Sequence, residues 1–102
     1  MRISPLATWM VVALAPMAVC AQDAHLARNL AATCANCHGT DGRARADARP
    51  LAGLPAAQII ATLAEFKSGA RPATIMPQIA KGYTDEQIRL VAGYFAAQTP
   101  QK

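Results

Sequence analysis

The sequence is poor in cysteine, histidine and aromatic residues. Its 102 residues include three cysteines and two histidines, and aromatic residues make up 5% of the chain. The basic residues are scattered, with no long run and no interleaved aromatics, so the sequence does not support nucleic-acid binding. It also has no internal repeat, no low-complexity segment and no convincing strand, which favours a single small all-α domain.

The sequence contains no convincing membrane span either. Residues 1–21 begin with a basic residue, continue through an apolar stretch broken by proline and end in small residues, as in a secretory signal peptide. We predict cleavage after Ala21, a domain over residues 22–102, a periplasmic location and no membrane anchor. A lipidated Cys20 is the alternative, although Val19 stands where lipoprotein signals favour a tiny residue.

The exported domain would keep only Cys34 and Cys37. Export allows a disulfide between them, but closing so short a loop would add almost no stability. A domain of this size has a marginal core, so a metal or cofactor is expected to complete it.

Three segments have helical patterns, and loops rich in glycine and proline separate them. Residues 23–38 place Leu26, Leu30, Cys34 and Cys37 on one face. Residues 55–69 begin at Pro55, end at Gly69 and carry apolar residues at helical spacing. The third segment, within residues 84–100, starts with a predicted capping box, and its expected buried face contains Ile88, Val91 and Phe95, with Thr84 and Gln87 forming the box.

The stretch CANCH, residues 34–38, matches the attachment signature of c-type haem. Cys34 and Cys37 are three residues apart and share a helix face, so both thiols are positioned to form thioethers to one haem edge. His38 follows directly and is predicted to bind the iron. A zinc site would need two more ligands, and a thioredoxin-like pair would need a strand before it, so both remain weaker alternatives.

Met76 is the predicted ligand on the other side of the iron. It is the only methionine in residues 22–102, and it lies in a loop with prolines on both sides. His25 is a poorer candidate because it shares the first helix with His38. The alternative role for Met76 is to fill a gap in the core, whereas His/Met ligation is common in electron-transfer cytochromes.

Four stretches together resemble a class I cytochrome c, and in particular the haem subunit of flavocytochrome c sulfide dehydrogenases and the cytochrome c4 group. They are CANCHGTDG, PLAGLP, FKSGARPATIM and IAKGYTDEQI with the following VAGYFAAQ. The resemblance implies three main helices around one covalently bound haem c. It also implies thioethers at Cys34 and Cys37, axial ligands at His38 and Met76, and a hydrogen bond from the His38 ring to the carbonyl of Pro50.

The leading functional hypothesis is a periplasmic electron carrier that is not itself an enzyme and works with redox partner proteins. The first alternative is the cytochrome subunit of a flavoprotein dehydrogenase, and the second is a haem enzyme or gas sensor with an open iron position. Lys67, Arg71 and Lys81 are expected to surround the exposed haem edge. Apolar side chains are expected to keep water from the haem: Leu51, Leu54, Ile59, Leu63, Phe66, Ile75 and Ile79.

Overall fold

The described part of the chain contains five α-helices and one 3-10 turn, joined by loops. The computed structural model describes residues 18–45 and 48–101. The elements are α1 (Ala18–Ala32), α2 (Ala35–His38), η1 (Thr40–Gly42), α3 (Ala56–Ser68), α4 (Met76–Lys81) and α5 (Asp85–Ala96), with no strand in these residues. The all-α prediction is therefore confirmed. Most of the predicted signal peptide, residues 1–17, lies outside the described residues, and cleavage after Ala21 stays a prediction.

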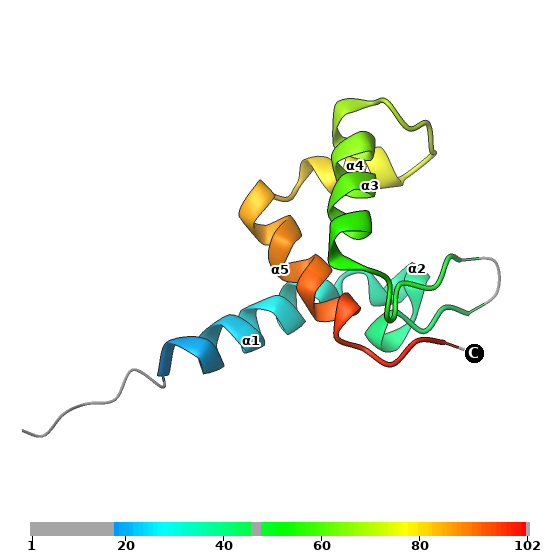
Figure 1. Ribbon diagram of the computed structural model, residues 1–102. Coiled ribbons are helices and arrows are strands. Elements are labelled where there is room, and N and C mark those ends of the chain that lie inside the picture. The colour runs from blue at the N-terminus through cyan, green and yellow to red at the C-terminus, as the bar shows by residue number, and fades with distance from the viewer. Residues whose placement is uncertain (1–17, 46–47, 102) are drawn as a thin grey trace, which may run out of the picture.

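The core lies where α1 crosses α5, and α3 packs on α5 from the other side (Figure 1). Small side chains form the crossing: Ala31 is 3% exposed and Ala92 is fully buried. Leu26 is 47% exposed, whereas Ala27 and Ala31 of the same helix are buried and Leu30 is half-buried against the core. Alanines allow the two backbones to approach closely, which a leucine stripe would prevent.

The predicted first helix is interrupted at Thr33 and Cys34. The Thr33 hydroxyl donates to the Leu30 carbonyl (3.1 Å), and the Cys34 N–H donates to Ala31 (3.0 Å) in a tighter turn than that of an α-helix. The chain restarts as α2, where the His38 N–H donates to the Cys34 carbonyl (2.8 Å). This break separates the attachment motif from the axis of α1.

The segment between α3 and α5, expected to be a loop, contains α4. This helix begins at Met76, and Pro77 stands in its first turn, where proline's missing N–H leaves no helical hydrogen bond unmade. The sequence prediction treated the prolines of this segment as helix breakers and so missed the helix. In Figure 1 α4 lies beside α3, and the two helices are in contact.

The predicted boundaries of α3 and α5 are largely confirmed. Gly69 ends α3 in the left-handed conformation, with φ of 86°. Thr84 and Gln87 form the predicted capping box, with hydrogen bonds of 3.1 and 2.9 Å. Ile88, Val91 and Phe95 are all buried, as the spacing indicates. Among residues 18–45 and 48–101, no helix has the length and apolar character needed to cross a bilayer.

Candidate haem-binding site

A cavity of about 370 Å³ opens between α2, α3, α4 and the loop after η1. Its volume lies within the range of small-molecule and cofactor sites. Most of its wall is apolar, and α3 forms one side with Ile59, Leu63 and Phe66. All seven apolar residues that were expected to exclude water line this cavity, Leu54 and Leu63 among them.

The two thiols of the attachment motif line one side of the cavity. Cys34 is half-buried and Cys37 is exposed, and both line the cavity. Burial raises the pKa of the Cys34 thiol, the nearby Cys37 adds to the increase, and a hydrogen bond with Thr33 partly offsets it. The break between α1 and α2 leaves the motif on its own short helix, so both thiols reach the same cavity.

His38 is held by a backbone carbonyl on the facing loop. Its Nδ1 lies 2.7 Å from the carbonyl oxygen of Arg49. A carbonyl only accepts hydrogen bonds, so Nδ1 carries the proton and Nε2 keeps a free lone pair for a metal. The ring thus has the tautomer and the fixed orientation that an axial ligand needs.

The predicted acceptor, Pro50, was wrong by one residue. The N–H groups of Leu51 and Ala52 both donate to the Gly42 carbonyl, at 2.9 and 3.2 Å. These bonds hold the chain after Pro50 against η1, and in this arrangement the carbonyl within reach of the imidazole is that of Arg49. Pro50 is itself exposed and does not line the cavity, so its role as a haem neighbour stays a prediction.

Met76 lines the same cavity from α4, at the first residue of that helix. Ile75 and Ile79 flank it and are 55% and 37% exposed, so the cavity has an apolar and open rim on this side. His25 is exposed on α1 and does not line the cavity. The structure therefore brings together Cys34, Cys37, His38 and Met76.

Several lining residues were missed by sequence reasoning. Gln58 and Thr62 share the inner face of α3 with Ile59 and Leu63, and a complete helical projection of that segment would have found them. Arg49 also lines the cavity, but it comes from a loop with no periodic signal, whereas Arg71, which was expected at the haem edge, does line the cavity. The other missed residues are Thr33, Ala48, Val91 and Phe95.

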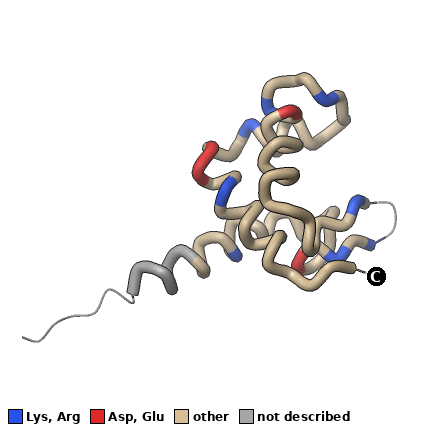
Figure 2. Tube along the Cα trace, in the orientation of Figure 1, with Lys and Arg blue, Asp and Glu red and all other residues tan. Residues whose placement is uncertain are grey.

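Two of the three cations expected around the haem edge, Lys67 and Arg71, form ion pairs within the domain. Arg71 Nε donates to Glu65 at 2.7 Å, and the Arg71 guanidinium also lies over the Phe66 ring. Lys67 Nζ is 3.7 Å from Asp85. Figure 2 shows the Lys and Arg residues spread over several segments rather than gathered in one patch. Two of the three expected rim cations thus have anionic partners within the domain.

The donor set and the shape of this site fit a covalently attached haem. Two thiols three residues apart provide the covalent links, an imidazole and a thioether provide a nitrogen and a sulfur ligand, and the remaining wall is mostly apolar. Within the part of the chain that the structure describes, no three His, Cys, Asp or Glu side chains are grouped to hold a bare metal ion.

Comparison with known families identifies the domain. Residues 21–95 match the family model described as "Cytochrome C oxidase, cbb3-type, subunit III". The chain belongs to this family. It is a class I c-type cytochrome, and its cofactor is covalently bound haem c.

Two named relatives support this assignment. The chain is 44% identical over 66 residues to the cytochrome subunit of sulfide dehydrogenase from Chlorobaculum tepidum, an alignment covering 65% of this chain and 60% of that relative. It is 38% identical over 69 residues to cytochrome c-553 of Desulfomicrobium norvegicum, covering 65% of this chain and 86% of the relative.

A solved structure shows the same fold. The cytochrome c4 of Acidithiobacillus ferrooxidans superposes with a TM-score of 0.69 and 32% identity, covering 74% of this chain. The match covers only 49% of the cytochrome c4 chain. The c-type cytochrome therefore spans about half the length of that protein and 60% of the sulfide dehydrogenase subunit.

Proposed function

We propose that this cytochrome is a periplasmic electron carrier with one haem, bound through thioethers at Cys34 and Cys37 and through axial ligands at His38 and Met76. The observation that carries the proposal is that Met76, 38 residues beyond His38, lines the same apolar cavity as the two cysteines and the histidine of the attachment motif. When bound, the haem iron supplies a one-electron redox couple.

The protein side chains have distinct parts in this proposal. His38, oriented by the Arg49 carbonyl, presents Nε2 to the iron. Met76 provides a neutral sulfur ligand from the opposite segment. Leu54, Leu63 and Ile59 line the cavity and would keep water away from a bound haem. With His38 and Met76 both holding the iron, the haem would supply electron transfer without binding a substrate.

A second candidate is the cytochrome subunit of a flavoprotein dehydrogenase. The similarity to the Chlorobaculum tepidum sulfide dehydrogenase subunit favours it, as does the exposed apolar pair Ile75 and Ile79 beside Met76. Such a pair is suited to a partner surface that covers the cavity rim. Stable co-purification with a flavoprotein from periplasm would favour this role, whereas isolation as a single chain would favour a free carrier.

Replacement of Met76 tests the ligand set. We expect Met76→Ala to let carbon monoxide bind the reduced protein and cyanide bind the oxidised one, because an axial position becomes free. Met76→His should keep six ligands and lower the reduction potential, since imidazole stabilises the oxidised iron more than a thioether does. The measurements are absorption spectra and a reductive titration. The intact mass should equal residues 22–102 plus one haem.

The matched control is Ile79→Ala, which changes the cavity wall on the same helix without removing a lone pair. It should leave the ligand spectrum unchanged. If Met76→Ala binds no more carbon monoxide than this control, another group is the sixth ligand.

A further inference from the structure

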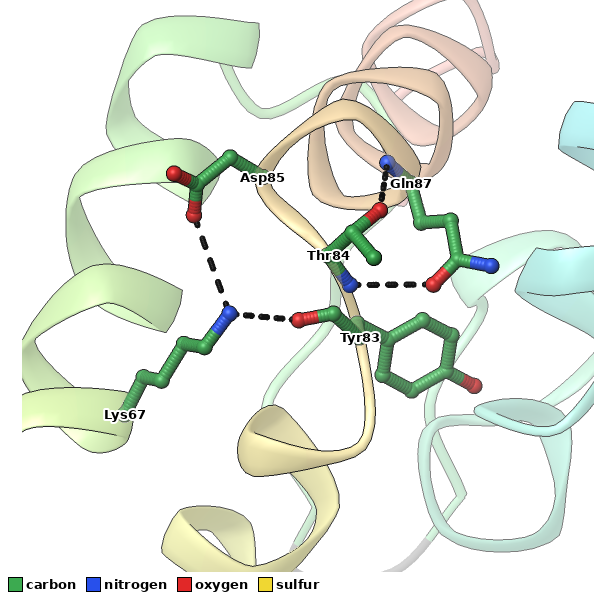
Figure 3. A network of polar contacts seen from close by, with 5 residues as sticks. All are labelled: Lys67, Tyr83, Thr84, Asp85 and Gln87. Carbon is green, nitrogen blue, oxygen red and sulfur yellow. Dashed lines mark hydrogen bonds and ion pairs between the residues drawn. The ribbon is translucent and has the colours of Figure 1, made fainter.

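Tyr83 connects three segments that are far apart in the sequence. It lies in the turn between α4 and α5, two residues after the end of α4. Its hydroxyl is hydrogen-bonded to that of Thr33, and a longer bond of 3.4 Å runs to the Leu30 carbonyl. Its backbone carbonyl accepts a hydrogen bond of 2.6 Å from Lys67 Nζ on α3 (Figure 3). Both ends of this residue are therefore held.

Lys67 makes two polar contacts, and its hydrogen bond to the Tyr83 carbonyl is the stronger of the two. The ion pair to Asp85 is 3.7 Å long, and the Asp85 side chain is 87% exposed, so solvent screens it and its contribution is small. The bond to the Tyr83 carbonyl is shorter, charge-assisted and partly buried. Lys67 thus acts mainly on the backbone that follows α4.

The other end of Tyr83 meets the chain beside the attachment motif. Thr33 immediately precedes Cys34, and Leu30 belongs to the last turn of α1, whose carbonyls have no helical partner. Tyr83 also lines a gap of about 20 Å³ together with Cys34, Leu63 and Met76. The ring therefore spans the distance between the helix of Met76 and the beginning of CANCH.

These contacts matter because, apart from its packing on α3, α4 has few restraints. It has only six residues, its sole fully buried side chain is Ala80, and the segment leading into it from Gly69 to Ile75 is exposed. Within the described ranges its extensive packing is on α3, and α1 is not among its main neighbours. The hydrogen bonds of Tyr83 to Thr33 and Leu30 thus join the end of α4 directly to the chain beside the attachment motif.

We propose that Lys67, Tyr83 and Thr33 form a clamp that positions Met76 against the Cys34–His38 segment. They are positioning residues: they act on the sixth ligand through the backbone of α4. This inference rests on the proposed role of Met76 as an iron ligand. Loosening the clamp raises the fraction of molecules in which an external ligand displaces Met76, so the apparent affinity for that ligand increases by the same factor.

The test uses the mature holoprotein, with imidazole as the external ligand of the oxidised iron. Tyr83→Phe removes the hydroxyl bonds and keeps the ring, and Lys67→Met removes the bond to the carbonyl and keeps an unbranched side chain. Each should tighten imidazole binding about 2- to 10-fold, the factor expected for the net loss of one hydrogen bond. The sulfur-to-iron charge-transfer absorption should weaken in parallel.

Gln87→Ala is the matched control at the same junction. It breaks the capping box of α5, beside Tyr83 in Figure 3, and lowers thermal stability, but it leaves both ends of the clamp intact. Its imidazole affinity should equal that of the unaltered protein. Asp85→Asn should behave in the same way, because the exposed ion pair contributes little.

The outcomes separate the two proposals. Unchanged imidazole affinity in both Tyr83→Phe and Lys67→Met, with a large increase in Met76→Ala, would overturn the clamp and leave the ligand assignment standing. An increase of equal size in Gln87→Ala would also overturn it, because general destabilisation would then explain the effect. No increase in Met76→Ala would overturn the ligand assignment itself. If Tyr83→Phe does not mature, Lys67→Met alone decides.

Discussion

The two halves of the haem site are held in different ways. The attachment half, formed by α1, α2, η1 and α5, stands on a buried helix crossing in which Ala31, Ala92 and Phe95 are at most 3% exposed. The methionine half, formed by the end of α3, residues 70–75 and α4, buries only Ala80 and exposes Ile75 and Ile79. The first half has its own buried core, whereas the second buries little and packs its short helix on α3.

Gly42 in the attachment half is closely packed, whereas Gly69 in the methionine half is not. A Cβ at Gly42 in η1 would lie 2.7 Å from the Ala52 nitrogen and 2.9 Å from the Phe95 ring. A Cβ at Gly69, at the end of α3, would meet nothing within 4 Å. The loop after the attachment motif is therefore packed against α5, while the approach to the methionine segment is open.

Truncation of the core should have the largest effect on this comparison. Phe95→Ala is expected to lower the free energy of unfolding by about 3–5 kcal/mol, because Phe95 is 1% exposed and supports both the helix crossing and the cavity wall. Ile79→Ala, in the methionine half, should lower it by less than about 2 kcal/mol because the side chain is already 37% exposed. Guanidinium unfolding of the two holoproteins gives both values.

The comparison fails if the two losses are equal. That result would mean that the haem, rather than the α1–α5 crossing, carries the stability of both halves. Circular dichroism of each variant before unfolding is the control for retained helix content.

The glycine pair provides a second and sharper test. Alanine at either position must adopt a positive φ, 77° at Gly42 and 86° at Gly69, which destabilises the fold by about 1–2 kcal/mol. Gly42→Ala should add an overpacking term of about 1–3 kcal/mol from Ala52, Leu51 and Phe95. Because the backbone term is common to both, the difference in unfolding free energy measures packing alone. Equal losses would contradict the tighter packing of the attachment half.

Sequence reasoning succeeded where local chemistry decides the structure. The capping box at Thr84, the end of α3 at Gly69 and the apolar wall formed by Leu63 and its neighbours follow from side-chain spacing and backbone preference. The attachment motif is likewise local, since Cys34 to His38 are nearly consecutive. The side of the cavity formed by the attachment motif and α3 was therefore predictable.

Most of the errors came from tertiary contacts. Thr33 is the exception, since its hydroxyl ends α1 early through a local bond to the Leu30 carbonyl. Ala31 is buried where α1 crosses α5, and the Arg49 carbonyl, rather than that of Pro50, accepts from His38. The pairing of Arg71 with Glu65 has no sequence signature either. Apart from the Thr33 bond, each depends on which segments the fold brings together.

The smallest expected effect concerns one hydrogen bond within the attachment half, between Tyr94 and Asp41. Tyr94 on α5 donates a hydrogen bond to Asp41 of η1, which has a positive φ of 56°. Like the bond between Tyr83 and Thr33, it is made by a tyrosine hydroxyl, but here the acceptor is a carboxylate. This bond raises the pKa of the Tyr94 phenol. The protonated phenol is therefore favoured in the folded protein, so the hydrogen bond from Tyr94 to Asp41 stabilises the fold below the ordinary tyrosine pKa of about 10. That stability is lost as the pH rises through the raised folded-state pKa.

Tyr94→Phe should thus lower the unfolding free energy by about 1 kcal/mol or less at pH 7, because the pair is partly solvated. The difference from the unaltered protein should stay constant up to about pH 9 and shrink above about pH 10. Asp41→Asn is the matched control: asparagine tolerates the positive φ and keeps an acceptor, but it removes the charge. Asp41→Asn should reduce the loss of unfolding free energy above about pH 10 and keep the hydrogen bond from Tyr94. A difference between Tyr94→Phe and the unaltered protein that stays constant to pH 11 would show that ionisation of this phenol does not contribute to the attachment half.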